Sequence, residues 1–515
     1  MKLSGKDFFI VLVVLAIAVL AGVWIAGETL TLPVVAGGIF LCVIIAQVSP
    51  VGFNPLVLGF LIAGYVLGNR GFAQFSVSAS LPLFPAELGI ATTLAVLVWR
   101  CAQERKLPWR NDFLNWALIL WMAVCTARLP FDVKTYGAMA LRDYAMVYYA
   151  LFFFIAQEAL APGAAWRWAR RCVLAATAAL PALYWASLLW PAFFLETLTV
   201  RGLPLIYFKG DLAGTFMSVG ALAWAECGMR IADCGMRNNQ GPSGWRLVGR
   251  ACAVLISLGL VAAMLATDNR AAMLALLAGV AVMLIGGRWK FAVALASAGA
   301  AAVVAILFWA QVTGTPWERT PLHGFTQRVA SVVDFQGSGN YSTAEGAESK
   351  GDNNKFRAVW WKTVVDETRT TNPWTGLGYG HDLAEAFLRA YYADSDDTFT
   401  ARSPHNLLLS IFARTGAVGL GAFLILCAVM CGRTWRAARL RARSQEGWPG
   451  EAWSYVWAIF VSACLGVVLE GPMGAVVFWI LLGAAAARSA GGPGGSNGIM
   501  GGTPMPLDPA GRFSG

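Results

Sequence analysis

Long apolar runs separated by short polar links follow one another along most of this chain. Residues 8–26, 30–48 and 291–311 each approach the roughly 20 apolar residues that an α-helix needs to cross a bilayer. Because a membrane helix satisfies its own backbone hydrogen bonds, the pattern predicts an all-α polytopic membrane protein. Fourteen candidate spans can be marked: 8–26, 30–48, 51–68, 86–100, 113–127, 138–160, 172–195, 210–228, 250–266, 270–287, 291–311, 405–430, 453–469 and 472–487.

One large polar stretch interrupts the series of spans. Residues 312–404 contain 12 acidic and 9 basic residues and are long enough to fold separately. Helical spacing of apolar residues predicts one helix over 354–370 and a shorter one over 384–393. Four parts are expected. Residues 1–311 form a transmembrane bundle with short loops, and residues 312–404 form a mostly helical insert. Residues 405–488 form the last transmembrane helices, and residues 489–515 form a disordered tail.

Charge follows the spans in a regular way. The chain has 57% hydrophobic and only 13% charged residues, with a formal net charge of +10. Its basic residues gather in alternate connections, and Lys and Arg in short loops favour the cytoplasmic side of a membrane. This alternation predicts cytoplasmic termini and puts the insert on the opposite face. The positive charge therefore indicates topology and lipid contact and gives no indication of nucleic-acid binding.

A few basic residues fall on the outer face, where this topology expects few. Arg142 lies about one turn inside a span, Arg201 and Lys209 bracket the loop RGLPLIYFK, and Arg270 begins a span. An ionisable group at such depth is costly unless it is paired or faces a wet cavity. Because Arg binds phosphate oxygens through two parallel hydrogen bonds, these residues predict an anionic site, most simply for a diphosphate. The alternative is that they reach lipid head groups or pair with nearby acids, namely Asp132, Asp143, Asp211 and Asp268.

His405 lies where a polar run meets an apolar one, in SPHNLLLSIFARTG. Ser403 and Pro404 are typical of a helix start, which would put the imidazole in the first turn of a span. There the helix dipole lowers the pKa of the ring, and a neutral imidazole can act as a general base. The alternative is a structural histidine that bonds a backbone carbonyl.

The insert holds the remaining candidates for chemistry. His323 and His381 share no metal-ligand spacing with His405, so no zinc site is predicted. Asp394 and Asp396 have the spacing of a divalent-ion motif, but a solvated acidic turn explains them better. None of the 10 cysteines lies in the insert, so no disulfide is expected there. We therefore expect neither a metal nor a cofactor.

Three motifs carry a resemblance to a known family: TDNRAAMLALLAG before a pair of spans, NPWTGLGYG in the insert, and SPHNLLLSIFARTGAVGLGAF leading into the last spans. They resemble the O-antigen ligase and polymerase superfamily of bacterial inner-membrane glycosyltransferases. The pattern of spans predicts 12–14 transmembrane helices. Members usually have about twelve spans, so the resemblance implies that two of the fourteen candidates are re-entrant or merged. Members commonly carry an acidic residue where this chain has Arg414.

The resemblance also implies an activity and roles for particular residues. It implies a metal-independent, inverting ligase that moves an O-antigen glycan from undecaprenyl diphosphate to a sugar hydroxyl of the lipid A-core, on the periplasmic side. His405 would be the general base, and the diphosphate would be bound by Arg201, Arg270, Lys209 and Arg142. Contacts to the acceptor or within the insert would come from Arg402, Asn406, His381 and Trp374.

Other functions stay open. An O-antigen polymerase or a protein O-oligosaccharyltransferase would share the histidine and arginine chemistry and use another acceptor. The single large outer loop favours a ligase, since polymerases of this group typically carry two sizeable loops. A lipid or polysaccharide flippase, from a different class, would place charge near mid-membrane in both halves, whereas here the charge gathers on the outer face.

Overall fold

A computed structural model describes residues 51–75, 84–200, 202–237, 244–267, 269–333, 350–391, 402–440 and 448–489. Several expected features lie outside these ranges: the spans 8–26 and 30–48, Arg201, Asp268, Asp394, Asp396 and the tail 490–515.

Helices make up nearly all of the regular structure in these ranges. The α-helices are α3 (Phe53–Leu67), α4 (Asn69–Gln74), α5 (Pro85–Glu104), α6 (Phe113–Tyr136), α7 (Ala138–Tyr148), α8 (Leu151–Ala159), α9 (Gly163–Leu189), α10 (Gly210–Arg237), α11 (Gly244–Ala266), α12 (Arg270–Ile285), α13 (Trp289–Thr313), α14 (Pro321–Val333), α15 (Lys350–Thr371), α16 (Glu385–Tyr391), α17 (Leu407–Arg439), α18 (Glu451–Ala463) and α19 (Pro472–Ser489). The other described elements are a π-helical turn, η1 (Phe193–Thr197), a 3-10 turn, η2 (Trp317–Arg319), and an antiparallel pair of strands, β1 (Thr199–Val200) and β2 (Leu203–Pro204).

In the described residues, 8 helical segments are long and apolar enough to cross a membrane. They are α5, α6, α7 continued by α8, α9, α11, α13, α17 and α19. The predicted all-α polytopic membrane protein is therefore confirmed. The shorter apolar helices α3 and α12 coincide with two further expected spans, 51–68 and 270–287.

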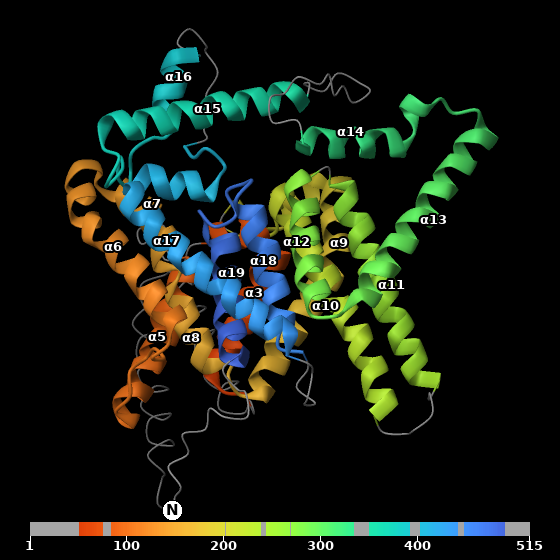
Figure 1. Cartoon of the computed structure of the whole chain (residues 1–515), viewed down its shortest axis with the longest axis horizontal. Helices are drawn as coiled ribbons and strands as arrows, with labels where there is room; N and C mark the ends of the chain where they lie inside the picture. The colour runs from red at the N-terminus through yellow and green to blue at the C-terminus, as the bar shows by residue number, and fades with distance from the viewer. Residues whose placement is uncertain are drawn as a thin grey trace, which may run out of the picture.

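Burial separates the centre of the bundle from its edge. In the most apolar 18-residue stretch of α19, 78% of the residues are buried, whereas in that of α13 only 6% are buried. Figure 1 shows α3, α18 and α19 at the centre and α13 at the outer edge. Small residues allow the central helices to approach closely, since a Cβ at Gly483 of α19 would meet the backbone of Phe153 in α8.

The insert covers one end of the bundle, which we call the insert end. Helix α15 lies across this end, and α16 stands above α15 on the side away from the bundle (Figure 1). A small apolar cluster joins them, with Trp360 of α15 packed against Phe387 of α16. The helices predicted over 354–370 and 384–393 correspond to α15 and α16, so both predictions are confirmed.

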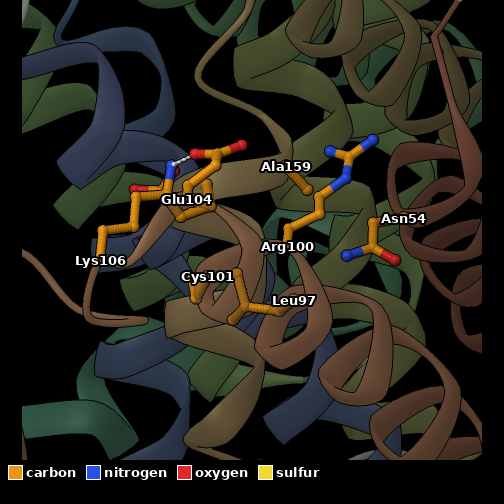
Figure 2. A pocket seen from close by; sticks show the side chains of 8 residues that line it. Asn54, Leu97, Arg100, Cys101, Glu104, Lys106 and Ala159 are labelled. Carbon is orange, nitrogen blue, oxygen red and sulfur yellow. Dashed lines mark ion pairs between the residues drawn. The ribbon is translucent and has the colours of Figure 1, made fainter.

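The opposite end of the bundle carries a separate set of charges. Arg433 of α17 pairs with Asp112 before α6, with 3.2 Å between Nη2 and Oδ2. A pocket at this end contains none of the predicted site residues, and Figure 2 shows how Lys106 and Glu104 pair at its rim. Its lining residues are Asn54, Leu97, Arg100, Cys101, Glu104, Lys106, Glu158 and Ala159.

Two of the last helices differ from the predicted spans. The expected span 453–469 ends as a helix at Ala463, and residues 464–471 form a non-helical loop before α19. Within α17, Gly416 has a φ of 64° and a ψ of −164°, which breaks the helix. An apolar run reveals neither feature, because hydropathy alone does not distinguish helical from irregular backbone.

Candidate active site

His405 lies in the turn that leads into α17 at the insert end. The helix begins at Leu407, and the Asn406 side chain caps it by accepting a hydrogen bond of 3.1 Å from a backbone amide of the first turn. The predicted helix start at Ser403 and Pro404 is therefore wrong, since His405 itself precedes the helix and has a left-handed φ of 57°. Such a conformation in a residue other than glycine persists only where surrounding contacts hold it, and it is common at functional sites.

A half-buried carboxylate, Glu470, holds this turn. Ser410 Oγ donates a hydrogen bond of 2.6 Å to Glu470 Oε1 and lies 3.3 Å from Ser403 Oγ. The backbone amide of His405 donates in turn to Ser403 Oγ, at 3.4 Å. Burial raises the pKa of Glu470, while the hydrogen bonds from Ser403 and Ser410 act in the opposite direction. Two serines thus connect the loop before α19 to the backbone of His405.

Two tryptophans of α15 cover the same turn. Trp361 Nε1 donates a hydrogen bond of 2.6 Å to the carbonyl of Pro404. The Trp360 ring centroid lies 6.1 Å from that of His405, and Trp360 is itself fixed by a hydrogen bond from Nε1 to the Leu383 carbonyl. The insert therefore packs directly on His405 and shields one side of the imidazole from solvent.

The surroundings keep the His405 imidazole uncharged. Its pKa falls from 6.5 to about 4, chiefly through burial and then through the positive charges of Arg357 and Lys209, while Asp211 acts in the opposite direction. The ring is neutral near pH 7, as the sequence predicted. The cause is different, because burial and neighbouring cations lower the pKa of a ring that precedes the helix. A neutral ring keeps a lone pair that can accept a proton.

Cations reach this region from three elements. Lys209 precedes α10, and its Nζ lies 3.6 Å from Asp211 Oδ2. Arg270 is the first residue of α12. Arg357 lies on α15, and its pKa is lowered by burial first and then by the positive charge of Arg270. Two of the predicted diphosphate ligands, Lys209 and Arg270, are thus brought to the end of the bundle where His405 lies.

The other two predicted diphosphate ligands are placed differently. Arg201 lies outside the described residues, and Arg142 is exposed on α7. Among the residues that the structure describes, no hydrogen bond or ion pair joins Arg142 to the His405 turn. The neighbouring acid, Asp143, pairs with Arg414 of α17 at 2.8 Å. The sequence left open that these outer cations pair with nearby acids. Lys209 does so, because it forms an ion pair with Asp211.

The four predicted acceptor contacts have different surroundings. Asn406 is used as the cap of α17. Arg402 Nη2 donates a hydrogen bond of 2.8 Å to a backbone carbonyl of the NPWTGLGYG loop, and His381 Nε2 lies 2.9 Å from Glu367 Oε1. Trp374, by contrast, is 68% exposed and presents most of its ring to the surroundings.

The NPWTGLGYG loop, residues 372–380, fills the break in α17. A Cβ at Gly416 would overlap the backbone of Trp374, so only glycine allows this close approach. Helix carbonyls and amides that lose their partners at the break pair with the loop, so backbone groups at this depth stay satisfied. Four hydrogen bonds do this: Leu377 N to Ala413 O (2.6 Å), Gly378 N to Arg414 O (3.2 Å), Ala417 N to Pro373 O (2.8 Å) and Val418 N to Trp374 O (3.2 Å).

Sequence reasoning missed Arg357 and Glu470. Arg357 is one of several basic residues in the insert, and its own helix gives no local signal that distinguishes it. Glu470 follows an apolar run that predicts a span through residue 469. The sequence does contain one indication of a loop here, because Glu470 is followed by Gly471 and Pro472, a pair that is typical of turns.

The chemistry of the site follows from a neutral base beside cations. Within the described ranges, no group of 3 or more His, Cys, Asp or Glu side chains is placed to hold a metal ion. The imidazole of His405 can accept a proton from a hydroxyl group. The cations at Lys209, Arg270 and Arg357 can stabilise negative charge that develops nearby.

Fold and site together define a polytopic membrane protein with a histidine and several cations under a helical insert. Residues 252–424 match the family model described as O-Antigen ligase. This match supports the resemblance of the chain to the O-antigen ligase superfamily that was seen in the motifs. That family is associated with a membrane context, lipid-linked glycan substrates and glycosyltransferase-type ligase or polymerase activity. No curated protein matches the chain.

Proposed function

We propose that the protein is an O-antigen ligase of the bacterial inner membrane, with its active site facing the periplasm and its termini in the cytoplasm. It transfers an O-antigen glycan from undecaprenyl diphosphate to a sugar hydroxyl of the lipid A-core. The bond between the anomeric carbon and the diphosphate oxygen breaks, and a bond to the acceptor oxygen forms with inversion. The reaction needs no metal and no cofactor.

His405 is the general base in this reaction. Its neutral imidazole takes the proton of the acceptor hydroxyl while that oxygen attacks the anomeric carbon. The ring is available for this step because burial and two cations disfavour its protonated form. The observation that carries the proposal is this uncharged His405 beside Lys209 and Arg357, in a chain whose segment 252–424 matches the ligase family.

The diphosphate is the leaving group, and the cations stabilise the negative charge that develops on it. Arg270 and Lys209 are its ligands among the described residues, and we assign Arg201 and Arg142 to the same role. Because the leaving group is already a stable anion, one base and a cationic cradle are chemically sufficient. The insert positions the two lipid-linked substrates, with Trp374 offering an exposed aromatic face to a sugar.

The test is transfer by the purified full chain, with undecaprenyl-linked glycan as donor and three rival acceptors. A ligase will glycosylate lipid A-core. Preferential extension of a second lipid-linked glycan would instead indicate the polymerase, and modification of an acceptor protein would indicate an oligosaccharyltransferase. Undiminished transfer in EDTA is expected from a metal-independent enzyme. Movement of the lipid across liposomes without any glycosidic product would identify a flippase.

A further inference from the structure

Arg357 projects from the insert toward the membrane-spanning bundle. Its Nη1 donates a hydrogen bond of 3.3 Å to the carbonyl of Leu465, in the same loop that carries Glu470. Trp360 follows it by three residues on α15 and packs against His405. Residues three apart on a helix lie on one face, so this face of α15 presents a guanidinium and an indole to the His405 turn.

The electrostatic environment of Arg357 favours an anion. Burial and the charge of Arg270 both act against its protonated form, and the acid that acts for it, Asp211, already lies 3.6 Å from Lys209. Among the residues that the structure describes, Arg357 forms no ion pair. Clustered cations at a partly buried site repel one another, and an anion bound between them removes that repulsion.

We propose that Arg357 is a further ligand of the donor diphosphate and that the insert, through this residue, completes the anion site formed by Arg270 and Lys209. The inference rests on the proposed function, which supplies the diphosphate. A diphosphate has several charged oxygens on two phosphorus atoms, more than a single fork-shaped guanidinium can engage. The same contacts strengthen as the glycosidic bond breaks and negative charge gathers on the leaving oxygen.

This assignment gives the insert a defined part in donor binding. α15 would contact the donor through Arg357 and the base through Trp360 and Trp361, so the diphosphate and the imidazole are held by one rigid helix. Precise relative placement of a leaving group and a base contributes to rate by orienting the reacting groups.

The experiment measures binding of undecaprenyl diphosphate, without a glycan, to the full chain in lipid nanodiscs. Arg357→Gln should weaken this binding by roughly ten- to hundredfold, because hydrogen bonds to a charged group are lost. Binding of undecaprenyl monophosphate should weaken less, since fewer oxygens are available to Arg357. Arg369→Gln, the same change at an exposed position of α15, should bind both lipids as the unmodified protein does.

Several outcomes overturn the proposal. Undiminished binding of undecaprenyl diphosphate by a folded Arg357→Gln variant removes Arg357 from the site and leaves the proposed function intact. If Arg357→Gln raises only the KM of the acceptor and leaves donor binding unchanged, Arg357 is likewise not a ligand of the diphosphate, and the proposed function stays intact. Should Arg357→Gln fail to fold, Arg357→Lys decides the question, because it keeps the charge and loses the fork: weaker binding supports the role and unchanged binding refutes it. If the unmodified chain does not bind undecaprenyl diphosphate, the proposed donor and this inference both fail.

Discussion

Ser410 of α17 donates a hydrogen bond of 2.6 Å to Glu470, in the loop before α19. Because Ser403 lies 3.3 Å from Ser410 and accepts from the amide of His405, this bond reaches the candidate base through the backbone. The left-handed φ of 57° at His405 needs such support. We therefore expect Glu470 to be a positioning residue that supports the backbone of His405 without touching the substrate.

Glu470→Gln should lower kcat for transfer roughly tenfold and leave the KM of the donor nearly unchanged, since the loss of a charged hydrogen-bond acceptor costs about 1.5–3 kcal/mol. Steady-state kinetics with the purified chain separate kcat from KM. Glu385→Gln, at an exposed position of α16, serves as the matched control. A parallel rise in donor KM, or a loss of thermal stability without any change in kcat, would argue against positioning.

Gly416→Ala should destabilise the protein and detach the NPWTGLGYG loop. A methyl group there meets the backbone of Trp374, and a left-handed φ adds strain of about 1–3 kcal/mol. Gly421→Ala is the control on the same helix, because a Cβ at Gly421 has nothing within 4 Å. That change should be neutral or stabilising, since alanine favours a helix by roughly 0.5–1 kcal/mol over glycine. Thermal unfolding in detergent measures both, and equal melting temperatures would contradict the packing described.

Asp143→Asn should cost about 3–5 kcal/mol, because it leaves the buried Arg414 guanidinium without its anion. The pair is 2.8 Å long, and the two side chains are 11% and 6% exposed. The double variant Asp143→Asn, Arg414→Gln should lose less stability than the two single variants added together. Additive losses in chemical unfolding would mean that the two side chains do not interact.

The pH dependence of transfer should reflect the low pKa of His405. A base acts in its neutral form, so activity is lost as pH falls through its pKa, which lies at about 4 in the free protein. The acid limb of kcat/KM should therefore lie well below the ordinary value of 6.5. The limb of kcat should lie at higher pH, because a bound diphosphate offsets the cations that lower the pKa of His405. A limb of kcat/KM near the ordinary histidine value would contradict the buried, cation-flanked imidazole.

Much of the fold could be predicted from apolar runs. The expected spans 113–127, 270–287 and 472–487 each fall within or closely match a helix, because apolar length and helical backbone are linked inside a membrane. The helix start at Leu407 was missed because Asn406, one residue after the histidine, provides the cap. Gly416 lies in an apolar stretch, and its broken geometry depends on a loop that is about forty residues away in the sequence.

The candidate site was partly predictable for a similar reason. Arg270 and Lys209 stand out because basic residues are unusual at the outer ends of spans. Arg357 belongs to a polar insert, where an arginine is unremarkable, and its importance comes from the folding of α15 onto the bundle. Glu470 likewise acquires its role from Ser403 and Ser410, which are distant in sequence.

Transfer by His405→Ala, assayed in vitro with undecaprenyl-linked glycan and lipid A-core, is the most direct test of the proposed mechanism. We expect transfer to be abolished while the variant still folds and still binds undecaprenyl diphosphate, because the base is removed and the cations remain. His323→Ala, whose ring bonds Gln327 on α14, should retain full activity. Transfer by His405→Ala at the rate of the unmodified protein would contradict the assignment of His405 as the base.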